Sequence, residues 1–565
     1  MGTAHHSRSR PIEGRLDQHD RDQFEVKLDY TIDRHNKRNR YEVDAYFFLP
    51  KSLGVDAQTY PKVQFYSDVQ AYIRLKTPQL SFQQLARTED GSSPLGRVMA
   101  QLEGSHRSDS RAEQEARLSR ELRLIGCSVR ANLRDRSRQL RHRLLGLLKL
   151  EAVDSHELEA LRSEVAALVQ EARGVLAKYR LLRPSFAPPQ FEATLAETYA
   201  LVDEYMSVTL EGQLTRLLQS LEQAGALSPA LQAERALLSQ CILDERAHRQ
   251  RCGQESLPQA EGGNETLVYR LGLLKKFVMS VLFLEIERNR DGHGTANFVA
   301  ALAAGLAMFL ATVGSVFVQT IYEVNTLPFV LALTTAYIAK DRVKEWAKLY
   351  LSAKMAPWLS DYRVKISSPV DGTVLGSCLE RVALCSPQSL PAEVLGARHG
   401  HRLHSIEARS KREVVLHYHK RVTIYGRKFN GLHQQAQEIN DIIRFSVASF
   451  STRMDDPVRS LLAFDEHQQR VRQVRCNKVY HLNLVFVLRA LDSGVSPHIE
   501  HARVILDKRG IRRVESNDTS PVHASLLSAG SADAEPRAVG EAPPPTAPRA
   551  RLLAGPPRAP RAARA

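Results

Sequence analysis

The longest uncharged stretch of the chain lies just past its middle. No charged side chain occurs between Gly294 and Tyr322, and residues 298–318 (FVAALAAGLAMFLATVGSVFV) are almost wholly apolar. A helix of about 20 apolar residues is long enough to cross the ~30 Å hydrocarbon layer of a membrane. Because a soluble helix of this length rarely lacks a charged face, the pattern predicts a transmembrane helix. The central helix of a large soluble core is the alternative.

A second apolar run, residues 327–340, follows after a short polar break. Lys340 and Arg342 at its end are able to extend towards lipid headgroups. We therefore predict a transmembrane hairpin over residues 296–340, with helices at 298–318 and over this second run. A re-entrant or interfacial segment is the alternative for the second run.

Positive charge flanks the predicted hairpin on both outer sides. The connecting loop contains no Lys or Arg, whereas basic residues lie before the first run and after the second: Arg288, Arg290, Lys340, Arg342, Lys344 and Lys348. Positively charged flanks stay in the cytoplasm. The sequence thus predicts a multi-pass protein of a bacterial-type inner (cytoplasmic) membrane, with both termini and all large domains in the cytoplasm.

The N-terminal pattern is β-like. Residues 1–22 are polar, and we expect them to be disordered. Apolar residues then alternate in 24–32 and recur densely in 41–50, which predicts a β-hairpin. With the aromatic-rich segment after it, this forms a predicted small β-hairpin and helix region over 23–108.

Helical periodicity dominates residues 109–255. Apolar residues recur at alternating steps of three and four along one segment: Leu158, Leu161, Val165, Leu168, Ala172, Val175 and Tyr179. Such a seam is typical of a helical bundle or a coiled coil, and the breaks at Pro184 and Gly225 favour the bundle. Residues 264–293 are expected to form a lead-in helix, lying either in the membrane interface or against the bundle.

Beyond the hairpin, a charged juxtamembrane helix is predicted at 341–358. Short strand-like runs then indicate a β-rich cytoplasmic domain at 359–515, with two helices near 432–440 and 457–473. The Pro-, Ala- and Arg-rich tail at 516–565 is expected to be disordered. The predicted fold class is therefore a membrane-anchored multidomain α+β protein with a cytoplasmic helical bundle, a two-helix transmembrane hairpin and a C-terminal β-rich domain.

The composition indicates a net positive charge and reduced cysteine thiols. The 78 basic and 63 acidic residues give a net charge of +15, which suits an anionic membrane surface or nucleic acid. Since an anchor is already indicated, the lipid bilayer is the simpler partner, and nucleic acid is not expected. The six cysteines show no zinc-type spacing and fit a reducing cytoplasm.

Catalytic motifs are absent from the sequence. It contains no phosphate-binding loop, dinucleotide fingerprint, nucleophile elbow, zinc-protease motif or calcium loop. Glu245 and His248 have the Glu-x-x-His spacing of di-iron bundles, but no second copy accompanies them. We therefore expect surface residues there and no cofactor, and the sequence leans towards a non-catalytic protein without deciding against an enzyme.

The weak metal candidates are His417 and His419. Strand alternation places both imidazoles on one face, and neutral imidazole is a common ligand of zinc and iron. No carboxylate stands at a clear companion spacing. Exposed or hydrogen-bonded histidines are the alternative.

Basic residues beside the hairpin and along 409–428 are candidates for binding anionic lipid phosphate. A solvated strand face is the alternative. The candidate residues are Lys340, Arg342, Lys344, Lys411, Arg412, Lys420 and Arg421.

Three functions remain open on this sequence. The leading hypothesis is a cytoplasm-facing interaction or scaffold protein that binds protein partners or self-associates. The second is a membrane-tethered enzyme or metal-dependent sensor that uses the C-terminal domain. The third is an oligomeric channel, since two helices per chain line a pore only when several chains assemble.

Overall fold

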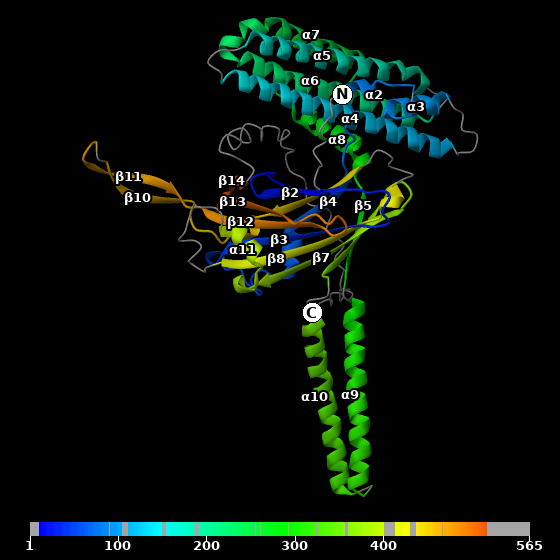
Figure 1. Ribbon diagram of the computed structural model, residues 1–565, viewed down its shortest axis with the longest axis vertical. Helices are drawn as coiled ribbons and strands as arrows, with labels where there is room; N and C mark the ends of the chain where they lie inside the picture. Colours follow the sequence, from blue (N-terminus) through cyan, green and yellow to red (C-terminus); the bar gives the residue numbers. More distant parts are fainter. Residues whose placement is uncertain are drawn as a thin grey trace, which may run out of the picture.

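The computed structural model describes residues 11–89, 91–103, 111–149, 154–186, 191–254, 256–259, 262–291, 293–323, 326–355, 360–399, 413–429, 437–465 and 467–516. Helices and antiparallel sheets make it an α+β protein, as the sequence predicts. Figure 1 shows three parts along the long axis: a helical unit, a central β unit and a long helical pair. The predicted tail after residue 516 lies outside the described residues.

Two antiparallel sheets form the β unit. The larger has the order β14 (Gly510–Ser516), β13 (His498–Asp507), β12 (Tyr480–Ala490), β3 (Asn39–Pro50), β8 (Glu413–Ile424), β7 (Val374–Cys385), β6 (Tyr362–Ser367), β5 (Glu285–Arg290). The smaller has the order β1 (Ile12–Gln18), β2 (Gln23–Thr31), β9 (Glu438–Ser446), β4 (Val69–Leu75). Aromatic side chains fill the space between them, and the rings of Phe47 and Phe445 lie 5.2 Å apart.

Strands from the two ends of the chain share both sheets, which corrects the predicted organisation. The sequence places 23–108 and 359–515 in separate regions, but β3 lies between β8 and β12, and β9 lies between β2 and β4. The predicted hairpin of 24–32 with 41–50 is also wrong, because β2 and β3 belong to different sheets. Within the predicted disordered segment 1–22, β1 pairs with β2.

The helical unit is an insertion into this β unit. The chain leaves at the end of β4 and returns beside it, where the Leu284 amide donates to the Ile73 carbonyl at 2.9 Å. Long helices lie side by side in the insertion (Figure 1). They are α4 (Arg111–Leu147), α5 (Ser155–Leu181), α6 (Ala193–Glu222) and α7 (Gln232–Arg251), with α2 (Phe82–Leu85), α3 (Pro94–Glu103) and α8 (Glu265–Met279) packed around them.

The seam predicted along α5 is buried within the chain. Six of its seven members, Leu161 to Tyr179, are no more than 1% exposed. The helices α4, α6 and α7 that cover it belong to the same chain, so the seam builds a bundle. The predicted lead-in segment 264–293 is divided: α8 packs on α4 and α6, while β5 is an edge strand.

The second insertion is the helical pair α9 (His293–Ile321) and α10 (Leu327–Met355). One helix in the described part of the chain is long and apolar enough to cross a membrane, Ala300–Ile321. Ala303 and Ala307 are buried on α9, the helix that packs along α10. The apolar start of α10 spans only about 20 Å before Lys340. The predicted second crossing is therefore not confirmed, and 341–355 continues the same helix.

A chain of ion pairs, buried from Glu380 onward, joins the two sheets. Arg288 of β5 donates to Glu380 of β7 at 2.6 Å, and Lys420 Nζ lies 3.7 Å from the same carboxylate. Lys420 Nζ also lies 2.6 Å from the carboxylate of Asp441 on β9. Burial opposes the charge of Lys420, but Asp441 and its neighbours raise the pKa of the ammonium. The side chains of Lys420 and Asp441 are at most 1% exposed, so water cannot solvate either charge if its partner is removed.

We expect the Lys420→Met substitution to lower the free energy of unfolding by about 3–5 kcal/mol. It keeps the apolar stem but leaves the Asp441 carboxylate buried without its cation. Denaturant unfolding of the detergent-solubilised chain measures this change.

Arg421→Met is the matched control. The adjacent Arg421 points to the opposite face and pairs with Glu42 near solvent, so its loss is expected to cost about 0–1 kcal/mol. Equal effects of the two substitutions would contradict a special role for the buried pair.

Candidate functional site

Strand alternation places two histidines on the outer face of the eight-stranded sheet. In β8, Tyr418 and Lys420 point into the space between the sheets and are buried. The side chains of His417 and His419 are each 26% exposed on the opposite face. The structure therefore brings the two predicted candidates together.

Asp44 of the neighbouring strand β3 connects these imidazoles. Its Oδ1 atom lies 2.8 Å from His417 Nε2 and 2.8 Å from His419 Nδ1. Its Oδ2 atom accepts a hydrogen bond of 2.5 Å from Arg489 of β12. One buried carboxylate is thus the common acceptor for three side chains from two flanking strands. We call these four residues the sheet cluster.

Packing holds the sheet cluster in place. The ring of Tyr46 stacks on His417 with centroids 4.4 Å apart and planes 2° from parallel. The helix α11 (Ala392–His399) packs on β12 and β13, and its Glu393 accepts a hydrogen bond from Arg489 at 3.0 Å. Both contacts restrict the rotamers of the cluster, since an aromatic ring and a fork-shaped guanidinium have strong orientational preferences.

The charges around His417 favour its protonated form. Burial would raise the pKa of Asp44, but hydrogen bonds from His417 and His419 outweigh it and hold that pKa well below its usual range. Burial would lower the pKa of His417, but its hydrogen bonds with Asp44 and Cys385 raise the pKa to about 9. At neutral pH, Asp44 is therefore a carboxylate that faces an imidazolium.

This arrangement offers two kinds of chemistry. Two imidazole nitrogens and one carboxylate oxygen lie within 4.8 Å of one another, which is compatible with a divalent transition metal. A metal must displace the proton that His417 carries, however, and the raised pKa of His417 opposes this at neutral pH. The geometry therefore supports an ion-pair cluster at neutral pH and metal binding only in competition with protons.

The predicted lipid-binding residues are spread over different environments. Lys340, Arg342 and Lys344 lie on α10 beyond its apolar start, and Lys340 Nζ lies 3.8 Å from the Tyr337 ring centroid. Arg421 is exposed on the outer sheet face. Lys411 and Arg412 lie outside the described residues. Lys420 is buried between the sheets, so its assignment to lipid binding is wrong.

The acid and the arginine of the sheet cluster, Asp44 and Arg489, are not predicted by the sequence pattern. Glu42 and Asp44 interrupt the apolar strand YEVDAYFF at alternate positions, which marks a polar side of that strand. Nothing local indicates that this polar side lies beside His417. The pairing of β3 with β8 brings Asp44 beside His417, which is 373 residues further along the chain.

No family model matches this chain, and no curated protein or solved structure matches it. The function of this chain is therefore inferred from its own geometry.

The stability contribution of the sheet cluster is expected to decrease at alkaline pH. The pKa of His417 is higher in the folded chain, about 9, than the ordinary value of 6.5. The stabilisation is therefore fully present below pH ~6.5 and is lost as the pH rises through about 9. We expect the free energy of unfolding of the wild type to exceed that of His417→Gln by about 2–3 kcal/mol at pH 6 and by little at pH 10. Unfolding free energies across this range measure the difference.

His467→Gln, in the exposed turn between β10 and β11, is the control and is expected to show no such pH-dependent difference. A pH-independent offset for His417→Gln would show that packing on Tyr46, and not charge, explains its effect.

Proposed function

We propose that this chain is a membrane-anchored interaction protein that holds its helical and β units at the cytoplasmic face of an inner membrane. The apolar surface of α9 supports the anchor. Only 11% of the most apolar 18-residue stretch within Ala300–Ile321 is buried in the protein. Large side chains such as Phe309 and Phe317 are 65% exposed. Lipid would cover this surface, which is costly to expose to water.

Strand pairing supports a hairpin that returns to the side from which it starts. The strand before α9 is β5 and the strand after α10 is β6, and the two are hydrogen-bonded neighbours with Arg290 opposite Tyr362. A single crossing by α9 would place these strands on opposite sides of the membrane. The pairing therefore favours both ends of the helical pair, and both large units, on one side.

We expect the wild-type chain to remain in membranes washed with alkaline carbonate, and a reporter fused after Ala565 to be cytoplasmic. The double substitution Leu306→Arg and Leu310→Arg is expected to release most of the protein. Each arginine at the centre of a crossing costs about 2.5–3.5 kcal/mol on an insertion scale.

Leu349→Arg on α10, outside the apolar window, is the matched control and should leave the protein in the membrane. Wild-type protein in the soluble fraction, or a reporter outside the cell, would refute the proposed anchor.

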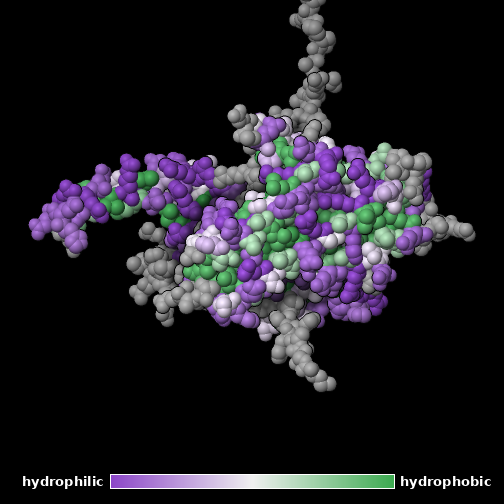
Figure 2. Space-filling view, turned by 90° about the horizontal axis from the view of Figure 1, so that it is seen from above, coloured by the Kyte–Doolittle hydropathy of each residue, from purple (hydrophilic) through white to green (hydrophobic). Residues whose placement is uncertain are grey.

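The observation that carries the interaction function is an arm formed by β10 (Val458–Asp465) and β11 (Arg470–Asn477). The two strands form their own sheet and extend away from the β unit (Figures 1 and 2). This arm replaces the helix predicted at 457–473. Leu462, Phe464 and Val471 share one face and are 79%, 63% and 64% exposed.

An isolated two-stranded ribbon is only marginally stable in water. The exposed apolar face of the arm would gain stability from a partner surface. Its strands carry four arginines and one acidic residue, so the complementary partner has acidic groups around an apolar patch. We therefore propose that the arm is the main contact for a protein partner.

The double substitution Leu462→Glu and Phe464→Glu should reduce partner capture at least tenfold, because apolar residues at the centre of an interface dominate its affinity. Cross-linking in cells, detergent extraction and quantitative mass spectrometry measure the capture. Leu181→Glu, an equally exposed apolar position on α5 (78%), is the matched control. The same proteins captured by both variants, or none captured by wild type, would contradict the proposed contact.

A second candidate is a membrane-tethered sensor that uses the sheet cluster. The convergence of His417, His419 and Asp44 favours it, because these ligand types approach one another on one sheet face. The stability titration of His417→Gln distinguishes this candidate. A sensor for a divalent metal would keep the cluster stable at alkaline pH when Zn²⁺ is added, since deprotonated imidazoles bind the metal.

A further inference from the structure

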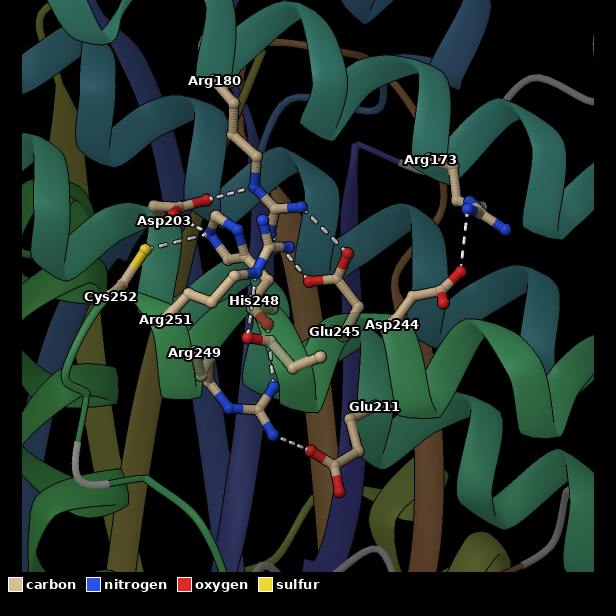
Figure 3. Close-up of polar contacts among 12 residues, drawn as sticks. Arg173, Arg180, Asp203, Glu211, Asp244, Glu245, His248, Arg249, Arg251 and Cys252 are labelled. Carbon is tan, nitrogen blue, oxygen red and sulfur yellow. Dashed lines mark hydrogen bonds and ion pairs between the residues drawn. The ribbon is translucent and has the colours of Figure 1, made fainter.

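The helical unit contains a second convergence of ligand types, at the end of α7. His248 and Cys252 are four residues apart, so both side chains lie on the same face of one helical turn. Asp203 of α6 faces this turn (Figure 3). The ligand atoms of the three residues lie within 4.8 Å of one another. We call them the helix cluster.

One imidazole nitrogen is the centre of the helix cluster. His248 Nε2 lies 2.8 Å from Asp203 Oδ2 and 3.7 Å from Cys252 Sγ. A catalytic Cys–His–Asp triad needs both ring nitrogens, one towards the thiol and one towards the carboxylate. Here the thiol and the carboxylate approach the same nitrogen. This is the arrangement of ligands that converge on one point, not that of a proton relay.

Neighbouring side chains orient the carboxylate and compensate its charge. Arg180 Nε donates to Asp203 Oδ1 at 2.9 Å, which turns Oδ2 towards His248. Arg180 also binds Glu245 through two hydrogen bonds of 3.0 and 2.7 Å, so its own charge is already balanced. Such outer contacts fix the direction of a metal ligand.

Access to the cluster suits a metal. The exposed Arg183 guanidinium lies 3.9 Å from Cys252 Sγ, on the solvent side of the cluster. The thiol and the imidazole are both partly exposed, which leaves a path from solvent.

We propose that Asp203, His248 and Cys252 bind one zinc ion, with a water molecule in the fourth position. Oxygen, nitrogen and sulfur ligands together suit Zn²⁺, and three protein ligands with one open position are typical of zinc sites that activate water. One carboxylate and one thiolate match the two positive charges of the ion.

Cobalt tests this site because Co²⁺ bound to a thiolate has its own near-ultraviolet absorption. The full chain, solubilised in detergent and stripped with chelator, is titrated with Co²⁺ and then with Zn²⁺. We expect one equivalent of Co²⁺ with a thiolate band that Zn²⁺ removes. Cys252→Ser should abolish the band and weaken binding at least tenfold, and His248→Gln should weaken binding similarly. Far-UV circular dichroism verifies the fold of each variant.

Two cysteine variants are the controls. Cys385→Ser changes the thiol beside His417 in the sheet cluster, and Cys476→Ser changes a thiol on the arm, so both should retain the band. Retention of the band in Cys252→Ser, its loss in Cys385→Ser, or absence of stoichiometric binding to wild type would each overturn the proposal.

Discussion

The pairing of β3 with β8 and β12 is the constraint on which the rest of this structure depends. Backbone hydrogen bonds join a strand near the start of the chain to two strands from its last third. Until residues 413–490 are present, β3 lacks both neighbouring strands. The larger sheet then cannot cover its side of the core between the two sheets. Pairings between such distant segments cost loop entropy before any contact compensates for it, and they form slowly. Apart from the edge strand β5, everything between β4 and β6 must therefore fold as insertions whose two ends lie on the neighbouring strands β4, β5 and β6.

Both insertions meet that requirement, and they do so at adjacent places. The helical unit starts after Leu75 and ends at Leu284, and the helical pair starts after Arg290 and ends before Tyr362. The short strand β5 lies between the two insertions and forms the edge of the large sheet. Its partly exposed Arg288 begins the chain of ion pairs that continues through the buried Glu380 to Lys420 and Asp441. The strands β5 and β6, from which the helical pair extends, are therefore connected to the interface between the sheets by ion pairs as well as by backbone hydrogen bonds.

Local periodicity was enough to predict the elements whose partners lie nearby in the chain. The seam of α5 and the apolar surface of α9 are repeated patterns, and each implies a helix with a buried or lipid-facing side. Alternation also predicted that His417 and His419 share a face. The same alternation places Lys420 and Arg421 on opposite faces of the strand. It does not show which face is buried, because that depends on the smaller sheet, whose strands are widely spaced in the sequence. Asp44 could not be found for the same reason, because its neighbours follow from β3 pairing with β8.

The two histidine clusters show how surrounding charge changes the chemistry of similar side chains. In the sheet cluster, Arg489 already occupies one oxygen of Asp44, and the remaining oxygen is shared by two imidazoles. The Cys385 thiol contacts His417 but is not among the three ligand atoms that converge there, so Asp44 is their one anionic member. Protonation of His417 satisfies that carboxylate. In the helix cluster, Cys252 converges with Asp203 on His248 and supplies a second anionic ligand. The arginines do not distinguish the clusters, since Arg489 and Arg180 each pair with a further glutamate. The second anionic ligand does, and it favours a metal on the helices and a proton on the sheet.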